Sequence, residues 1–275
     1  MVKSKILITI FTLLITFPAY SFEGYDKYPM QGNTIFSLGE VNIKLSEIRV
    51  IMDREEKGIM GGSTKITADH ILENLADKEV NFKVAFPIES SCLSNCTEMP
   101  RDFKVSINGK PIQTSMSKIL SKELEERIER KLSSNNIKLE KQDKKHAETT
   151  AKEYEIPLIV WDISLKPKEK KTIICAYTLE WEFSPGTDSA TDQFIYNLLP
   201  IILWKGKVEK AYFKLILPRR LIDYIKSGKA KISINPKDYY KREDNVIEWF
   251  FQNLDFKRIK LRDISVFITY LGAGE

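Results

Sequence analysis

The sequence holds two histidines, His70 and His146, and they lie far apart in the chain. His70 falls on a predicted strand face with Ile66 and Leu72, whereas His146 lies in a charged stretch. A histidine-dependent nucleophile needs a Ser or Cys and an orienting acid beside the imidazole, and no nucleophile-elbow or Cys-His motif marks such a site. We expect His70 to be a half-buried structural residue and His146 to be a surface residue.

Carboxylates are the other groups that could do chemistry. Asp188 and Asp192 follow Gly186 in one predicted loop and could act as calcium ligands or as an acid and base, but the spacing lacks the glycine and bidentate glutamate of an EF-hand loop. Asp162 could converge with them in a cleft. A zinc site requires three or four ligands at recognisable spacing, which this chain does not supply. We predict no catalytic residues, no metal and no cofactor.

The three cysteines divide into a pair and a single residue. Cys92 and Cys96 flank a short polar loop ahead of Pro100 and are predicted to form a disulfide, which persists in an oxidising compartment. Cys175 alternates with Ile173 and Tyr177 on the apolar face of a predicted strand. It is therefore predicted to be a buried free thiol that packs as a small hydrophobic residue.

Two segments are candidates for binding. The run from Phe194 through Tyr196 to Trp204 is either a buried strand pair or a partly exposed apolar loop that docks on a partner. The segment that begins with Lys257 and Arg258 is either a charged sheet edge that prevents aggregation or a patch for anionic envelope polymers. These five residues are the candidate binding residues.

The beginning of the chain has the layout of a secretory signal. Lys3 and Lys5 precede an uncharged run from Ile6 to Phe17, and small residues follow at Ala19 and Ser21. The apolar run is too short to cross a hydrocarbon core, which takes about 20 residues. We predict cleavage after residue 21 and a periplasmic or extracellular location.

The charge of the predicted mature chain is small. Loss of two signal lysines lowers the formal net charge from +5 to +3 (5 − 2), within a chain that has 43 basic and 38 acidic residues. A balance of this size does not indicate nucleic-acid binding. No later segment is long and apolar enough to predict a stable membrane span. The partner is predicted to be a protein or another envelope component.

Alternation of apolar and polar residues predicts most of the chain to be strands. Thr64–Leu72 and Val80–Ile88 both alternate, and with the polar stretch Asn74–Glu79 between them they are predicted to form a hairpin. Phe103–Ile107 ends at Asn108-Gly109, a dipeptide suited to a type I′ turn, and predicts a second hairpin.

The pattern changes between Met116 and Leu132, where a hydrophobic residue recurs at every fourth position with charged residues between. This spacing predicts one amphipathic helix. The following stretch, to about Glu153, has few apolar residues and is predicted to be a solvated helix or a linker.

Many short strands separated by turn signals favour a sandwich. The predicted fold is mainly β, with β-sandwich-like antiparallel sheets and one amphipathic helical insertion, α+β at the margin. The predicted regions are a signal peptide (1–21), an N-terminal β region (22–116), a helical and charged insertion (117–155) and a C-terminal β region (156–275). Whether the two β regions form one domain or two is left open.

Short motifs follow one another along the chain in a recognisable order. They are Val84-Ala85-Phe86-Pro87, the strand and turn from Phe103 to Gly109, the helix from Ser117, Trp161 with Pro167 and Tyr177, then Tyr196, Trp204-Lys205-Gly206 and the strand from Phe213 to Pro218. In this order the chain resembles an uncharacterised family of exported bacterial proteins, a domain of unknown function. The likeness covers most of the mature chain and is loose before Gly62. It implies an exported β-rich fold without an assigned activity.

We predict an exported, non-catalytic binding or envelope-assembly protein that uses a sandwich surface or loop tips. Two alternatives remain. One is a carboxylate-dependent envelope hydrolase, and the other is a periplasmic domain that binds a small ligand in a pocket between sheets and helix.

Overall fold

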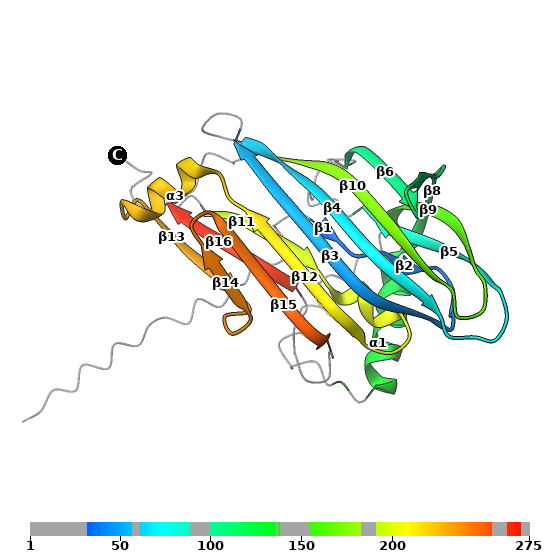
Figure 1. Ribbon diagram of the computed structural model, residues 1–275. Helices are drawn as coiled ribbons and strands as arrows, with labels where there is room; N and C mark the ends of the chain where they lie inside the picture. The colour runs from blue at the N-terminus through cyan, green and yellow to red at the C-terminus, as the bar shows by residue number, and fades with distance from the viewer. Residues whose placement is uncertain are drawn as a thin grey trace, which may run out of the picture.

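The computed structural model describes residues 32–56, 61–88, 100–135, 137, 155–182, 191–254 and 263–270. Within these residues the protein is mainly β, as predicted, and three sheets form a sandwich (Figure 1). Most strand pairs are antiparallel, but β3 pairs with β12, and β1 with β11, in parallel. The predicted antiparallel sheets are confirmed, and the sequence patterns did not indicate these two parallel pairs.

One eight-stranded sheet forms a complete layer of the sandwich. In order across the sheet, its strands are β14 (Tyr240–Glu243), β15 (Val246–Leu254), β12 (Val208–Ile216), β3 (Ile43–Glu56), β4 (Gly61–Asn74), β10 (Lys170–Glu182), β6 (Arg101–Ile107) and β7 (Lys110–Pro111). Alternate residues of β3, β4 and β12 are buried, so one face of this large sheet lies on the core.

Two four-stranded sheets form the opposite layer. The β11 sheet has the order β1 (Gly32–Asn33), β11 (Thr191–Asn197), β16 (Asp263–Tyr270) and β13 (Ala230–Asn235). The β9 sheet has the order β2 (Phe36–Ser37), β5 (Val80–Pro87), β9 (Glu155–Leu165) and β8 (Ser115–Leu120). Ring contacts join each to the large sheet: Tyr196 to Phe213 at 5.6 Å, and Phe86 to Tyr177 at 5.0 Å.

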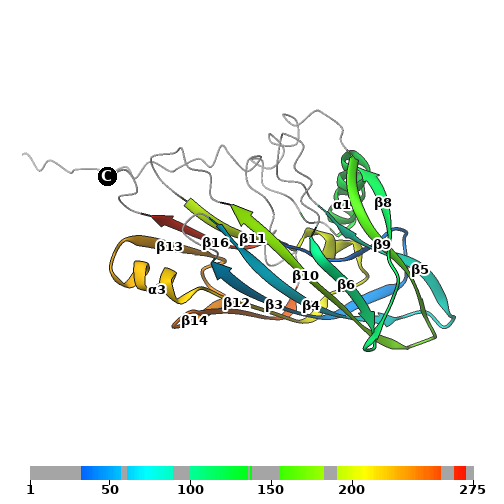
Figure 2. The same cartoon turned by 90° about the horizontal axis from the view of Figure 1, so that it is seen from above.

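The helices lie at the periphery of the sandwich. α1 (Ser121–Ser134) and the 3-10 helix η2 (Leu199–Leu203) cover the face of the β9 sheet that points away from the large sheet, and α3 (Arg219–Lys226) lies at the other end (Figure 2). Leu124 and Leu132 of α1 pack there with Phe36 and Leu158. Arg127 donates a 2.7 Å hydrogen bond to the Ser37 carbonyl oxygen. β9 is therefore buried on both faces along residues 158–161.

The predicted hairpin between Thr64–Leu72 and Val80–Ile88 is wrong, although both strands exist. β4 pairs with β3 and β10, whereas β5 pairs with β2 and β9 in the opposite layer. The buried Asn74 side chain supports this crossing, because its amide donates to the carbonyl oxygens of Lys78 (2.9 Å), Leu165 (3.0 Å) and Lys166 (3.0 Å). Alternation identifies a strand and its inner face, and it does not identify the neighbouring strand.

The predicted helix begins later than expected. Residues 115–120 form β8, and α1 begins at Ser121. Met116 and Leu120 are four residues apart, which is one helical turn and also an even number of strand residues, so both periodicities place them on one side. Pairing with β9 decides between the two.

The predicted turn at Asn108-Gly109 is confirmed, with φ values of 49° and 78°, and it joins β6 to β7.

Candidate functional site

Three of the predicted binding residues are core residues. Phe194 and Tyr196 lie on β11, and Trp204 follows η2, and all three are buried. The Tyr196 hydroxyl donates to the Asn33 carbonyl oxygen at 3.0 Å, and the Trp204 indole donates to that of Ile35 at 2.9 Å. The segment is thus a core strand followed by a 3-10 helix rather than a strand pair. These side chains expose too little surface to bind a partner, which corrects the docking alternative for them.

Several other predicted residues lie outside the described part of the chain. They are the signal segment 1–21, Cys92, Cys96, His146, Asp188, Lys257 and Arg258. Asp192 is placed on β11 by its backbone alone. The disulfide, the export signal and the basic patch stay predictions.

Asp162 lies on the exposed surface of β9 in a cross-strand ion pair. Its Oδ1 is 2.9 Å from Lys83 Nζ on β5, at a directly paired position. Exposed ion pairs of this kind contribute little to stability. Across the described ranges, no group of three or more His, Cys, Asp and Glu side chains is arranged to hold a metal ion.

His70 and Cys175 lie in the core on neighbouring strands. His70 is fully buried on β4 with Ile66 and Leu72, so the predicted face is right and the burial is greater than expected. Burial lowers the pKa of His70 to about 4. Cys175 is a buried free thiol, as predicted, and burial raises its pKa. At neutral pH both groups are uncharged.

An interior polar cluster lies where the β11 sheet meets the β9 sheet. It consists of Asn33, Tyr177 and Tyr196, from β1, β10 and β11. The Asn33 amide donates to the Pro87 carbonyl oxygen of β5 at 3.3 Å. Among the described residues the Asn33 Oδ1 atom has no hydrogen-bond partner, and the Tyr177 hydroxyl lies beside the Asn33 backbone without a well-formed hydrogen bond. Burial raises the pKa of both tyrosines. Sequence reasoning missed Asn33 because its strand is two residues long and shows no alternation.

The outer face of the large sheet carries a row of side chains that crosses four strands. Phe250 on β15 pairs with Tyr212 on β12, Tyr212 pairs with Arg49 on β3, and Arg49 pairs with Asp69 on β4. We call these four residues the aromatic–arginine row. Figure 1 views this face directly, and no described helix or strand covers it.

The row is exposed and internally ordered. Phe250 is 51% exposed, and the guanidinium carbon of Arg49 lies 6.0 Å from the centre of the Tyr212 ring. The Tyr212 hydroxyl donates to Glu248. Partial burial, with the Glu248 carboxylate beside it, raises the pKa of Tyr212 to about 12. Burial also raises the pKa of Asp69, and the positive charge of Arg49 opposes that rise.

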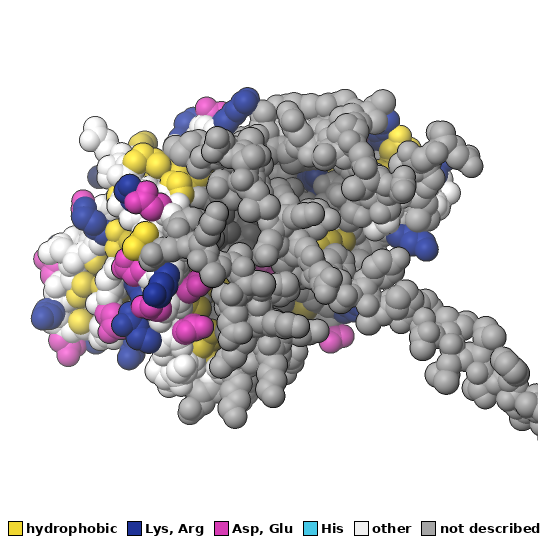
Figure 3. All heavy atoms as spheres, turned by 180° about the vertical axis from the view of Figure 1, so that it is seen from behind, with side chains coloured by type: hydrophobic (Ala, Val, Ile, Leu, Met, Phe, Trp, Pro, Cys, Tyr) yellow, Lys and Arg dark blue, Asp and Glu magenta, His cyan; other side chains and the backbone are white. Residues whose placement is uncertain are grey.

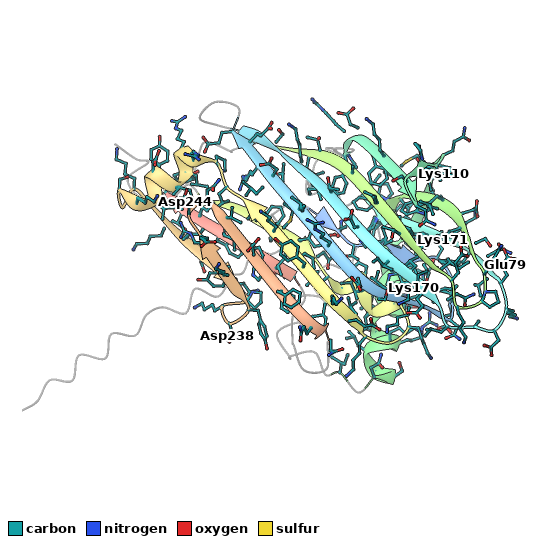
Figure 4. The ribbon with its side chains drawn as sticks, in the orientation of Figure 1. Glu79, Lys110, Lys170, Lys171, Asp238 and Asp244 are labelled. Carbon is teal, nitrogen blue, oxygen red and sulfur yellow. The ribbon has the colours of Figure 1, made fainter. Side chains whose placement is uncertain are left out.

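Charges around the row are paired across strands, so the face mixes both signs. The pairs are Lys210 with Glu47 (3.5 Å), Lys214 with Glu248 (4.0 Å), Lys65 with Glu55 (2.7 Å) and Lys170 with Glu73 (3.3 Å). Figure 4 labels Lys170 and Lys171 at the end of this sheet beside the β9 sheet, and Asp244 near α3, where it pairs with Lys226 at 3.0 Å. This local neutralisation is unsuited to a highly charged polymer.

No protein-family profile matches this sequence, and no curated protein matches it. The resemblance inferred from the short motifs therefore stays a prediction. Among solved structures, a Legionella pneumophila protein proposed to bind nutrients is similar over 86% of this chain and 70% of its own, with a TM-score of 0.56 and 16% identity. At this identity the likeness shows the fold alone.

Peptidases give weaker similarity. A Deinococcus radiodurans M1 zinc metallopeptidase has a TM-score of 0.30 at 7% identity, over 84% of this chain and 43% of its own. A Parabacteroides distasonis protein proposed to be a protease has a TM-score of 0.27 at 9% identity, over 84% and 41%. This chain spans less than half of either, and similarity this low supports no functional argument.

Proposed function

We propose that this chain is an exported, non-catalytic binding protein that holds a partner protein on the outer face of its large sheet. The observation that carries the proposal is the aromatic–arginine row, which aligns Phe250, Tyr212 and Arg49 on an uncovered face. Tyrosine and arginine are enriched among the residues that contribute most to binding energy in protein interfaces.

The contacts within the row support a binding role. Arg49 is held by the Tyr212 ring, and the Tyr212 hydroxyl is held by Glu248. Side chains that are ordered before binding lose less conformational entropy when a partner arrives. The paired charges around them favour a partner of mixed charge, as most protein surfaces are, over nucleic acid or an anionic polymer.

The state of the buried titratable groups supports a non-catalytic role. A general base or nucleophile works best with a pKa near the operating pH. Burial moves the pKa values of His70, Cys175 and Tyr177 away from neutrality and toward the uncharged forms. The binding role proposed for the Legionella protein of similar fold agrees with this interpretation. The signal-like N-terminal sequence supports export.

A second candidate function is the binding of a small polar ligand between the sheets. The Asn33 Oδ1 atom favours it, because this buried atom has no hydrogen-bond partner among the described residues and buried polar atoms usually have one. Under this alternative, Asn33→Leu would abolish ligand binding and Phe250→Ala would leave it unchanged. If a partner docks on the large sheet, Phe250→Ala should abolish partner binding and Asn33→Leu should leave it unchanged.

Site-specific photo-crosslinking in cells tests the proposal. A photoreactive amino acid at position 250 should give one discrete adduct, because Phe250 would lie within the partner interface. The matched control replaces Lys122 on α1, which is exposed and remote from the row. Combining the crosslinker with Arg49→Ala should remove the adduct. An adduct that survives Arg49→Ala, or that forms equally at position 122, contradicts the proposal.

A further inference from the structure

Strand β8 forms one edge of the β9 sheet. It pairs with β9 along all six of its residues, from Ser115 opposite Val160 to Leu120 opposite Glu155, without a register shift. On its other side, no strand pairs with it in the described part of the chain. Backbone N–H and C=O groups on that side are a template for another extended chain.

The side chains of β8 leave hydrophobic surface at this edge. Met116 and Leu120 are 55% and 42% exposed, and strand alternation places them on one face with Lys118 between them. The Nζ atom of Lys118 lies 2.6 Å from Glu155 of β9 in an exposed ion pair, which only weakens the positive charge at this edge. Figure 3 shows basic, acidic and hydrophobic side chains mixed over the end of the molecule that carries α1 and β8.

The other described sheet edges have protective features that β8 lacks. β1, β2 and β7 are each two residues long, and β7 includes Pro111. β14 is four residues long and contains Lys241, Arg242 and Glu243. β13 lies against α3 and is followed by Pro236. Short length, several charges and proline are usual means of blocking edge pairing, and β8 has six residues, one lysine and no proline.

We propose that β8 binds an extended segment of another polypeptide by strand addition. Only another extended backbone satisfies a row of alternating donors and acceptors, and apolar side chains at alternate positions of the added strand would pack on Met116 and Leu120. This interaction is independent of the row proposed above, because β8 and the row belong to different sheets.

Charge at Lys118 decides between a second copy and a different polypeptide. In the antiparallel self-pairing that sets Met116 opposite Leu120, Lys118 falls opposite its own copy, because it lies midway between these two residues. Like charges directly opposite one another are destabilising. The segment that binds is therefore from another polypeptide and has an acidic or neutral residue opposite Lys118.

The probe is a labelled synthetic peptide in which every second residue is threonine. The residues between the threonines are valine, glutamate and valine, in that order. Fluorescence anisotropy with the full chain should detect binding, and hydrogen exchange should slow within residues 115–120. The double variant Met116→Lys/Leu120→Lys should weaken binding at least tenfold. Phe250→Lys is the matched control, because Phe250 is similarly exposed on the large sheet. This variant should bind the peptide as tightly as the unchanged protein does.

Four results would overturn the inference, and the fourth concerns the control variant. One is a lack of exchange protection in residues 115–120 at saturating peptide. Another is equal binding by the double variant with an unchanged melting temperature. The third is concentration-dependent dimerisation that the double variant abolishes, which would assign the edge to a second copy. Loss of binding in Phe250→Lys would also count against β8, whereas failure of crosslinking at position 250 leaves the β8 result unaffected.

Discussion

The guanidinium carbon of Arg49 lies 6.0 Å from the centre of the Tyr212 ring, at directly paired positions of the parallel strands β3 and β12. Both side chains point away from the core, so their contact is made on the surface of the sheet. The contact orders an arginine and a tyrosine, two residue types that are common in protein interfaces, before any partner binds.

Replacing Arg49 by alanine should reduce partner binding without unfolding the protein. An exposed cation–π contact is worth about 0.5–1 kcal/mol, so the free energy of unfolding should fall by no more than that. The pKa of Asp69 should rise further, because the charge of Arg49 opposes the effect of burial. Carbon-detected NMR titration of Asp69 measures this rise, and an unchanged pKa would show that the two groups do not interact.

His70 should make stability depend on pH. Its folded-state pKa of about 4 lies below the ordinary value of 6.5, so the unfolded chain binds more protons between these limits. Stability is therefore complete above about pH 6.5 and falls as the pH decreases toward 4, with a loss of about 2 kcal/mol at pH 5. Urea unfolding at pH 7 and pH 5 should show this loss, and His70→Leu should remove it. Equal pH dependence in both proteins contradicts the assignment.

Two tyrosine-to-phenylalanine changes should differ in their effect on stability. Tyr196→Phe removes the hydrogen bond to the Asn33 carbonyl oxygen and should cost about 1 kcal/mol. Tyr177→Phe removes a buried hydroxyl that makes no well-formed hydrogen bond to the described residues and should be neutral or stabilising. Each variant serves as the other's control in thermal unfolding. A clear loss of stability in Tyr177→Phe would mean that its hydroxyl has a partner.

Asn74→Ala should be among the most damaging single polar substitutions. It leaves three backbone carbonyls and the Ala76 amide without the Asn74 side chain. The bond to the Leu165 carbonyl is buried, the other three are part-buried, and the Lys166 carbonyl keeps the Glu169 N–H as a donor. An unsatisfied buried group costs about 1–3 kcal/mol, so we expect a total of about 3 kcal/mol. The control is Asn135→Ala at the end of α1, where one hydrogen bond to Lys131 is lost. Chemical denaturation of both variants measures the difference.

Thiol labelling should separate the cysteines. Cys175 is buried with a raised pKa, so iodoacetamide should not modify it in the folded protein. Under denaturing, non-reducing conditions, the predicted Cys92–Cys96 bridge leaves Cys175 as the single reactive thiol. Mass spectrometry of the digested protein would then find one alkylated site. Three alkylated cysteines would refute the bridge.

The sequence by itself determined most of the longer strands and which of their faces is buried. Alternation in β5 and β6, the Asn108-Gly109 turn and the apolar side of His70 were all readable, because these features depend on neighbours along the chain. The four-residue spacing from Met116 was ambiguous for the same reason. It satisfies helix and strand geometry equally until a pairing partner is known.

Only the tertiary structure decided which strands are neighbours and which apolar residues remain exposed. Phe194 and Phe250 both lie in aromatic-rich strands, yet the first is buried between layers and the second faces outward. Phe250, Tyr212 and Arg49 come from distant parts of the chain and meet only through the registers of β15, β12 and β3. Strand pairing depends on the free energy gained when whole layers bury their faces against one another. This free energy cannot be assigned to a single segment of the chain.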